Sequence, residues 1–473
     1  MGLKGLMPRF HPKVSLRQIP LGMLVITILA AASTLIVLLR PSDDPEGILM
    51  WTFINTRAPV YREIVETMEQ GSGSDARIEL VEFNALRRRI LSGFSAGTPL
   101  ADLLEVEREI ASPTWRGPVE AVGFIDLKPR LEAEGLLDKI NPASFSPWTN
   151  RGRIYGLPGD VHPTLLCYRA DVFEAAGIDV SELDTWEKFF AATRHLVRDF
   201  NRDGQADQYV FEMQETTSEV VRALLLQAGG GLFDADDRPV LNSPLNVRVL
   251  ARMADWGTGE DRVTGDLDFS SGAGNRLRAE GYVLSWLVPD WRAHHTRLYI
   301  GSLAGKLKLM PLPAWEEEGR RTTALGGTML GIPRTSRHIE ESWEFAKRLY
   351  LSPELAVRSW REFGVLTPVK AFWDHPLYSE PDPYFSGQSS GRLFIDQAPD
   401  VPVRSSSPYR RLASQELANA FNALIRFARR TGTEDPEVLE QEAADLLEEA
   451  QNNILRQMRR NVFIDLDEPE EGS

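Results

Sequence analysis

Cysteine is scarce in this sequence of 473 residues, since Cys167 is the only one. A single cysteine excludes a disulfide framework within the chain and a metal cluster held by several cysteines. The usual catalytic spacings are also missing: there is no HExxH, no P-loop, and no GxGxxG that opens a helix after a strand. With 36 glycines and 30 prolines the chain is not of low complexity. We therefore expect a folded protein of roughly two to four domains.

Two weak matches to nucleophile patterns do not change this picture. Residues 93–97 read GFSAG and fit GxSxG, but a nucleophile elbow needs a strand before the serine, and here the predicted helix comes first. Cys167 lies in the apolar run TLLCY and has no basic neighbour before Arg169, which is typical of a small core residue. We therefore predict no catalytic residue and no enzyme activity.

Negative charge is absent from the first 40 residues, which contain Lys4, Arg9, Lys13, Arg17 and Arg40. The net charge of −15, less the five positive charges of this segment, leaves −20 for residues 41–473. A body this acidic repels phosphate backbones and anionic lipid headgroups. We expect no nucleic-acid partner.

Residues 21–39 form a run of nineteen residues without a charge, of which eleven are Leu, Ile or Val. These eleven contribute roughly −3 to −7 kcal/mol on the insertion scale, enough for one spanning helix. Four cations precede the run and one follows it, which places the N-terminus in the cytoplasm. The sequence thus predicts a cytoplasmic segment over residues 1–20, a single-pass signal anchor in the inner (cytoplasmic) membrane over 21–39, and a linker over 40–46. The remainder is then periplasmic or extracellular.

A cleaved signal peptide is the alternative interpretation, because Ala30, Ala31 and Ala32 resemble a small-residue cleavage site. Cleavage there leaves the apolar residues 34–39 as a new N-terminus. The apolar run is also longer than the roughly 7 to 15 residues of a signal-peptide core. The pattern favours an uncleaved anchor.

Strand and helix patterns alternate after the linker. Residues 48–53, 77–83 and 102–106 read as buried strands, and helical spacing follows the first two of them. Such alternation predicts an α/β fold with a parallel sheet covered on both faces. Two long amphipathic helices are predicted near residues 409–430 and 436–460.

One polar loop, DFNRDGQAD over residues 199–207, matches part of a calcium-binding loop. Gly204 takes the turn position, but Val210 stands where a bidentate glutamate is expected. The ligands of such a structural calcium are Asp199, Asn201, Asp203, Gln205 (through its carbonyl) and Asp207. A polar turn without metal is the alternative. No other cofactor is predicted.

Four segments carry a resemblance to a known family. They are ILMWTFINTRAPVYREIVETMEQ; residues 90–129 with FSAGTPLADLLEVE and GFIDLKP; RIYGLPGDVHPTLLCYRADVFEAAGID followed by TWEKF; and GGTMLGIPRTSRHIEESWEFAKRLYLSPELA. In this order they resemble the extracellular solute-binding proteins of ABC importers, in the carbohydrate branch that is similar to maltose-binding protein. The resemblance covers residues 47–460, and the third segment is the most specific.

The resemblance implies an α/β, two-lobed periplasmic-binding-protein fold with hinge crossings between the lobes. Lobe 1 is expected over residues 47–160 and 326–400, lobe 2 over 161–325 and 401–460, and an acidic tail over 461–473. The chain departs from the family pattern at Ala101-Asp102, where Pro-Asp is usual. It also departs in its predicted anchor, since most members are soluble or attached by a lipid.

The ligand of a two-lobed α/β protein lies where strands end and the chain crosses between lobes. Sugars need aromatic faces and planar polar groups, and glycine lets the backbone approach a ligand. The predicted ligand-binding residues are Trp51, Asn55, Glu107, Arg108, Asp160, His162, Trp286, Asp290, Trp291, Gly326, Gly327 and Thr328.

The function implied is that of a monomeric receptor that captures a sugar or oligosaccharide by closing two lobes and delivers it to ABC permease subunits. A tethered ligand sensor for a membrane signalling partner is one alternative. A periplasmic glycan-processing enzyme is the other. Ligand identity does not follow from the sequence.

Overall fold

The computed structural model describes residues 21–39, 47–72, 76–268 and 271–463, and the chain divides into two units, Met1–Glu46 and Gly47–Ser473. The first unit contains helix α1 (Leu21–Leu39). None of the helices among these residues combines the length and the apolar content that crossing a membrane requires. The predicted anchor is therefore not confirmed. The predicted segments at 1–20 and 40–46, and most of the acidic tail, lie outside the described residues.

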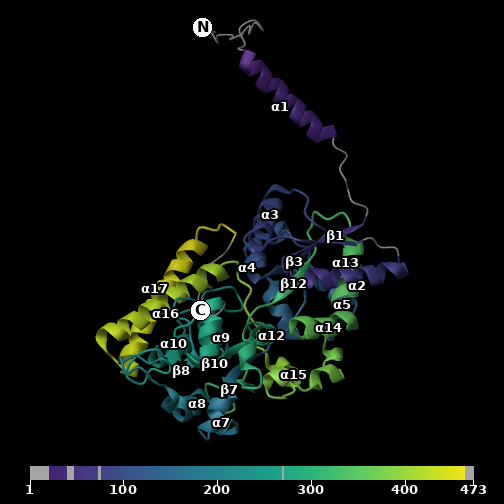
Figure 1. The fold of residues 1–473 in the computed structure, drawn as a ribbon. Coiled ribbons are helices and arrows are strands. Elements are labelled where there is room, and N and C mark those ends of the chain that lie inside the picture. The colour runs from purple at the N-terminus through teal and green to yellow at the C-terminus, as the bar shows by residue number, and fades with distance from the viewer. Residues whose placement is uncertain (1–20, 40–46, 73–75, 269–270, 464–473) are drawn as a thin grey trace, which may run out of the picture. The chain divides into compact units, whose positions relative to one another are not determined.

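The second unit is built on two five-stranded sheets, one in each lobe (Figure 1). The first sheet has the order β2 (Ala76–Leu80), β1 (Ile48–Thr52), β3 (Leu103–Glu107), β12 (Thr328–Gly331) and β6 (Leu157–Pro158). β1 runs parallel to β2 and β3, whereas β12 is antiparallel to β3 and β6. Strand β12 comes from far along the chain, so lobe 1 is closed by a segment that has already passed through lobe 2.

Helices cover both faces of the first sheet. α2 (Arg57–Ser72) and α13 (Ile339–Tyr350) share one hydrophobic cluster with Leu103 of β3. α3 (Phe83–Ala96) shares another with Leu104. Because successive strand residues point to opposite faces, Leu103 and Leu104 belong to different layers of the core.

The second sheet has the order β11 (Leu307–Pro311), β7 (Thr164–Arg169), β10 (Val283–Pro289), β8 (Tyr209–Glu212) and β9 (Thr264–Gly265). β10 is antiparallel to β7 and parallel to β8. All seven residues of β10 are buried, as expected of a central strand covered on both faces. The two-lobed α/β fold predicted from the sequence is thus observed.

The second sheet is covered on one face by helices that share its largest hydrophobic cluster, namely α8 (Trp186–Thr193), α9 (Glu219–Gln227), α10 (Pro244–Trp256), α16 (Arg410–Thr431) and α17 (Pro436–Met458). The last two confirm the predicted amphipathic pair. The shorter remaining elements are α4 (Arg108–Ala111), α5 (Lys128–Ala133), α6 (Pro142–Phe145), β4 (Thr149–Asn150), β5 (Arg153–Ile154), α7 (Ala170–Ala175), α11 (Gly272–Glu280), α12 (Asp290–Tyr299), α14 (Pro353–Arg358) and α15 (Ser390–Gln397).

The chain crosses between the lobes near residues 159–163, 324–327 and 398–409. A small apolar cluster that includes Val161, Ala324 and Val401 packs these crossings together. Helix α15 contacts β7 and β11 of the second sheet, whereas the boundary predicted at residue 400 assigns it to lobe 1. Helix α15 therefore packs on lobe 2 although it precedes the last crossing in the sequence.

Two residues singled out from the sequence have structural roles. The Ser95 hydroxyl lies within α3 and donates to the carbonyl of Leu91, so it is not at a strand-to-helix elbow. Cys167 is fully buried in β7, and burial raises the pKa of its thiol well above the usual value. Neither residue has the surroundings of a nucleophile.

Candidate functional site

Three predicted residues form a buried hydrogen-bonded group: Asp160 and His162 lie on the first crossing, and Asp290 begins α12 of lobe 2. His162 lies between two carboxylates, with its Nδ1 2.6 Å from Asp290 and its Nε2 3.1 Å from Asp160. Burial disfavours the charged form of His162, but the adjacent carboxylates outweigh it and raise the pKa of His162 to about 9. The same pairing keeps the pKa of Asp160 below its usual range, despite burial. At neutral pH His162 is an imidazolium that donates to both aspartates.

Asp160 also holds the strand that returns from lobe 2. Its carboxylate accepts hydrogen bonds from the backbone N–H of Thr328, at 3.1 Å, and from the Thr328 hydroxyl, at 2.6 Å. Asp290, at the start of α12, accepts from the backbone N–H of Leu366 at 2.7 Å. The group therefore ties the first crossing to α12 of lobe 2 through Asp290 and to β12 of lobe 1 through Thr328.

A second buried carboxylate continues the network into lobe 1. Glu105 of β3 accepts from Arg57 at 3.0 Å, from Tyr61 at 2.8 Å and from Tyr350 at 2.9 Å. Arg57 in turn lies 3.7 Å from Asp160. We call the alternating chain of Glu105, Arg57, Asp160, His162 and Asp290 the hinge network. Every charge in it has a partner of opposite sign.

The return crossing depends on two glycines. Gly326 and Gly327 have φ angles of 94° and 124°, which side chains rarely tolerate. A Cβ at Gly326 would also lie 3.0 Å from the indole nitrogen of Trp291 and 3.1 Å from the ring of His162. The backbone at these glycines therefore passes close to two other predicted residues. Its approach to a ligand, for which the glycines were singled out, stays a prediction.

Trp291 links α12 to this crossing. Its indole N–H donates to the carbonyl of Leu325 at 3.2 Å, and its backbone N–H donates to Asp290 at 2.8 Å. The side chain is half-buried and packs against the cores of both lobes. Its position at the hinge is compatible with ligand contact, which stays a prediction.

Three predicted residues lie apart from the crossings. Trp51 donates to Glu79 at 3.1 Å within lobe 1, and the guanidinium of Arg89 lies over its ring. Asn55 is exposed in the turn before α2. Trp286 is fully buried in β10 and packs in a core cluster of lobe 2. The structure does not bring these three side chains to the hinge network.

A cavity of about 1070 Å³, which we call the cleft, lies between the lobes. Lobe 1 contributes Trp115, Phe145 and Asn150 to its walls, and lobe 2 contributes Phe233 and Asp237. The amide of Asn150 donates to the carboxylate of Asp237 at 2.7 Å across it. These residues were not predicted. The glycine run at 229–231 after a helix was the one local signal for them, because it allows backbone to line a cavity.

A smaller cavity of about 120 Å³ adjoins the cleft and shares Gly230, Gly231 and Arg404 with its wall. The predicted residues Arg108 and Gly326 line it, together with three further arginines. Predicted Glu107 lies beside it and caps α4 by accepting from the N–H of Glu109 at 2.7 Å. Burial and the charge of Glu109 raise the pKa of Glu107 to about 7.

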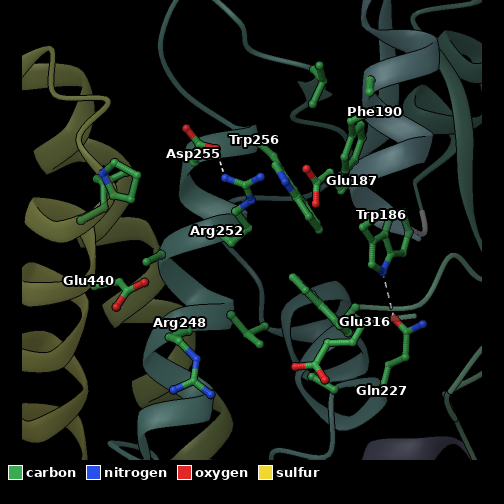
Figure 2. Close-up of a pocket in the computed structure, with 18 of the residues that line it drawn as sticks. Trp186, Glu187, Phe190, Gln227, Arg248, Arg252, Asp255, Trp256, Glu316 and Glu440 are labelled. Atoms are coloured by element: carbon green, nitrogen blue, oxygen red, sulfur yellow. Dashed lines mark hydrogen bonds and ion pairs between the residues drawn. The ribbon is translucent and has the colours of Figure 1, made fainter. Parts of the chain in front are cut away.

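A third cavity, of about 680 Å³, belongs to lobe 2 alone (Figure 2). Its walls carry the charged side chains of Arg252 on α10 and Glu440 on α17, beside Trp186 and Trp256. Trp256 stacks on Trp315 with ring centroids 5.2 Å apart, and both belong to the lobe 2 core. Since lobe 1 contributes nothing to its lining, a molecule bound there would not draw the lobes together.

The predicted calcium loop is a compact polar turn. Asp199 accepts from the backbone N–H groups of Arg202 and Gly204, and Asp207 accepts from those of Phe200 and Asn201. Within the described part of the chain, no group of three or more His, Cys, Asp or Glu side chains is arranged to hold a metal. Calcium binding at 199–207 stays a prediction.

The chain forms two lobes, each built on its own sheet, and both lobes wall the cleft between them. This is the arrangement of a two-lobed binding protein that closes around its ligand. Comparison of the sequence with known families agrees: the chain belongs to the bacterial extracellular solute-binding proteins, whose family pattern matches residues 64–382. The match spans most of both lobes and the first two crossings between them.

Curated relatives share this family. An arabinooligosaccharide-binding protein of Halalkalibacterium halodurans is 24% identical over 403 residues, covering 81% of this chain and 86% of the relative. A protein of the same description from Bacillus subtilis is 26% identical, covering 68% and 73%. A lactose-binding protein of Rhizobium radiobacter is 24% identical, covering 64% and 71%. All three are described as binding proteins and none as an enzyme.

The fold is also that of solved sugar-binding proteins. The sugar-binding protein MalE from Xanthomonas citri superposes with a TM-score of 0.69 at 19% identity, covering 88% of this chain and 99% of its own. A binding protein of B. animalis solved with β-1,6-galactobiose superposes with a TM-score of 0.63 at 15% identity, covering 88% and 98%. At these identities the likeness establishes the fold alone.

Proposed function

We propose that this protein is the extracytoplasmic receptor of an ABC importer and captures a sugar or oligosaccharide in the cleft between its lobes. The observation that carries the proposal is the cleft itself, which is walled by both lobes and lies beside the crossings. Its volume of about 1070 Å³ is at the upper end of the roughly 300–1,000 Å³ typical of ligand pockets, so it suits several sugar rings. The descriptions of the relatives support this ligand class.

A screen of sugars by thermal shift on the purified protein tests the proposal. A ligand at about 100 times its Kd adds about 2.7 kcal/mol to the free energy of unfolding, which is a clear rise in melting temperature. The panel should contain arabinose, galactose and glucose oligosaccharides together with their acidic counterparts. If no sugar of any kind raises the melting temperature, the proposal is wrong. Analysis of the same mixtures for cleavage products separates binding from glycan processing.

Closure of the lobes is the expected consequence of binding. A ligand that contacts both walls of the cleft binds the closed arrangement better than the open one, so it shifts the population toward closure. Small-angle scattering should show a smaller radius of gyration at saturation. An unchanged radius with full occupancy would argue against closure.

Delivery to permease subunits and attachment to the membrane are finer parts of the proposal. Permease partners follow from the family, and attachment through residues 21–39 is supported by the uncharged apolar sequence alone. Carbonate extraction of membranes tests attachment, because an integral anchor keeps the full-length protein in the pellet. Recovery of a soluble form that begins near residue 33 would establish cleavage instead.

A further inference from the structure

Four arginines from distant parts of the chain meet at the small cavity beside the cleft. Arg108 begins α4 in lobe 1, Arg222 lies on α9 in lobe 2, Arg404 lies in the last crossing, and Arg410 begins α16. We call them the arginine cluster. Both lobes and the crossing between them therefore contribute positive charge to one cavity.

The hydrogen bonds of these arginines leave most of their charge without a counterion. Arg108 donates to the carbonyl of Ser405 at 2.7 Å, and Arg404 donates to the carbonyl of Gly326 at 2.5 Å. Arg222 makes only long contacts, at 3.3 Å to a backbone carbonyl and 3.4 Å to a hydroxyl. Carbonyl and hydroxyl oxygens satisfy donors but do not neutralise a guanidinium.

The four arginines of the cluster differ in whether they form an ion pair. Arg410 lies 2.8 Å from Glu109, but among the described residues Arg108, Arg222 and Arg404 form no ion pair with a carboxylate. The Nε of Arg404 is buried and has no hydrogen-bond partner there either, although the residue is only 5% exposed. A buried guanidinium with an unused donor is costly unless something else pairs with it.

The electrostatics of the cavity agree with this geometry. Burial, followed by repulsion from Arg410, lowers the pKa of Arg222 to about 9 and lowers that of Arg108 well below its usual value. Burial lowers the pKa of Arg404 to about 10. Asp160 attracts Arg404 and Glu219 attracts Arg222, but neither forms an ion pair with the cluster among the described residues. Glu107 has a pKa near 7 and Glu109 pairs with Arg410, so Arg108, Arg222 and Arg404 keep no paired carboxylate.

Elsewhere in the same protein, buried arginines are paired. Arg278 and Arg292 both bind Glu212, with contacts of 2.5 and 2.8 Å, and Arg57 binds Glu105 at 3.0 Å. Arg108, Arg222 and Arg404 have no such ion pair among the described residues, although Arg410 of the same cluster pairs with Glu109. This is the arrangement expected where a bound anion supplies the missing charge.

We propose that the arginine cluster binds an anionic group of the ligand, so that the sugar captured in the cleft is acidic. This inference rests on the proposed function. The anion is a carboxylate of a uronic acid or a phosphate of a phosphorylated sugar, and both match the planar fork of arginine donors. The small cavity takes the charged group while the adjoining cleft takes the rest of the saccharide.

The position of the cluster also couples the anion to closure. Arg108 is held by lobe 1 and Arg222 by lobe 2, and their like charges repel across the cavity. An anion between them converts this repulsion into two attractions, so it stabilises the arrangement in which the lobes approach. A neutral sugar would leave the repulsion in place.

Calorimetry with three sets of probes tests the inference: neutral oligosaccharides of arabinose, galactose and glucose; uronate oligosaccharides of galacturonate and glucuronate; and monosaccharide phosphates. We expect one acidic set to bind roughly 10 to 100 times tighter than its neutral counterpart. Its affinity should fall between about 50 and about 200 mM salt. Uronate binding identifies the carboxylate, and sugar-phosphate binding identifies the phosphate.

Substitutions show whether the affinity for an acidic probe depends on the arginine cluster or only on the net charge of the protein. Arg108→Gln and Arg222→Gln should each lower the affinity for the acidic probe roughly 10-fold or more, and Arg108→Lys should restore only part of the loss. Arg276→Gln, at an exposed arginine of α11, is the matched control and should change nothing. Melting temperatures of all variants show whether they fold. Arg222→Gln is the safer variant because its hydrogen bonds are long.

The outcomes distinguish this inference from the proposed function. If a neutral sugar binds as tightly as any acidic one and the arginine variants retain that affinity, the inference is wrong and the receptor function stands. If no probe of any set binds, both are wrong. If acidic probes bind but Arg108→Gln and Arg222→Gln leave the affinity unchanged in folded protein, the anion lies elsewhere and the inference is wrong.

Discussion

The hinge network contains residues of the first crossing between the lobes, and the arginine cluster contains a residue of the last. The two groups differ in how buried charge is paired. In the hinge network each of Arg57 and His162 lies between carboxylates. In the arginine cluster, Arg108, Arg222 and Arg404 have no carboxylate in an ion pair within the part of the chain that the structure describes. Paired charges stabilise a fixed arrangement, whereas unpaired charges of one sign are stabilised when a counterion binds. The comparison separates a structural device from a binding one.

The largest expected effect is on the hinge network. Asp160→Ala removes the shared partner of His162, Arg57 and Thr328, and breaking a buried ion pair costs about 3–5 kcal/mol. Urea unfolding measures this loss. Asp171→Ala is the control, because Asp171 pairs with Arg169 at a partly exposed position and should cost less than about 1 kcal/mol. Equal losses in the two variants would show that the hinge network is no stronger than a surface pair.

The hinge network should also make stability depend on pH. Folding raises the pKa of His162 from 6.5 to about 9, so its contribution is fully present below about pH 6.5 and is lost as the pH rises through 9. The shift corresponds to about 3 kcal/mol. Urea unfolding between pH 6 and pH 9.5 should show the decline, and His162→Gln should remove it. A decline that persists in the variant would assign it to another group.

Substitution of Trp291 tests whether the hinge contacts the ligand. Trp291→Ala should lower affinity by about 1–3 kcal/mol if the indole stacks on a sugar ring, with little loss of fold stability. Calorimetry with the sugar found by the screen measures the first effect and urea unfolding the second. Trp373→Ala is the matched control, since Trp373 also donates its indole N–H to a backbone carbonyl. A large loss of stability with unchanged affinity would make Trp291 a core residue.

The arginine cluster should respond to substitution with little change in stability, or with a gain. Arg404→Gln removes a buried charge that has no ion pair among the described residues and that Asp160 attracts while Arg410 repels it. The cost of burying the charge is also removed, so the free energy of unfolding without ligand should stay within about 1 kcal/mol of the wild type or rise. The paired Arg278→Gln should instead lose about 3 kcal/mol or more, because it leaves Glu212 short of a partner. If Arg404→Gln is as destabilising as Arg278→Gln, Arg404 is structural and the contrast between the two regions fails.

The smallest expected effect is at the polar loop over residues 199–207. A site without the bidentate glutamate should bind calcium weakly, with Kd near about 10⁻⁴–10⁻³ M, so 1 mM calcium should add about 0.4–1.4 kcal/mol to the free energy of unfolding. Melting temperature with calcium and with chelator measures it. Asp203→Ala should abolish the rise and leave ligand affinity unchanged. Unchanged melting in metal-free protein would show that the loop is only a polar turn.

Local pattern accounts for much of the fold that was predicted. Strand β1 and helix α17 lie where apolar spacing placed them, and Gly326 and Gly327 form a crossing with positive φ as glycine pairs can. Asp160, His162 and Thr328 were predicted as ligand-binding residues at the crossing segments, and Asp290 in the run SWLVPDW. The structure brings these four into one hydrogen-bonded group, and ligand contact stays a prediction. Trp286 shows the limit of this reasoning, because position after a strand pattern does not reveal that β10 is central and covered on both faces.

The sequence by itself determined the alternation of strands and helices and the candidate residues near strand ends, because periodicity and turn chemistry act over a few neighbouring residues. The two-lobed class followed from the resemblance of four segments to a known family. Only the tertiary structure decided that Arg108, Arg222, Arg404 and Arg410 share one cavity. These four are separated by up to three hundred residues. Nothing local marks an arginine as lacking a carboxylate, since pairing depends on which side chains the packing of two lobes brings together.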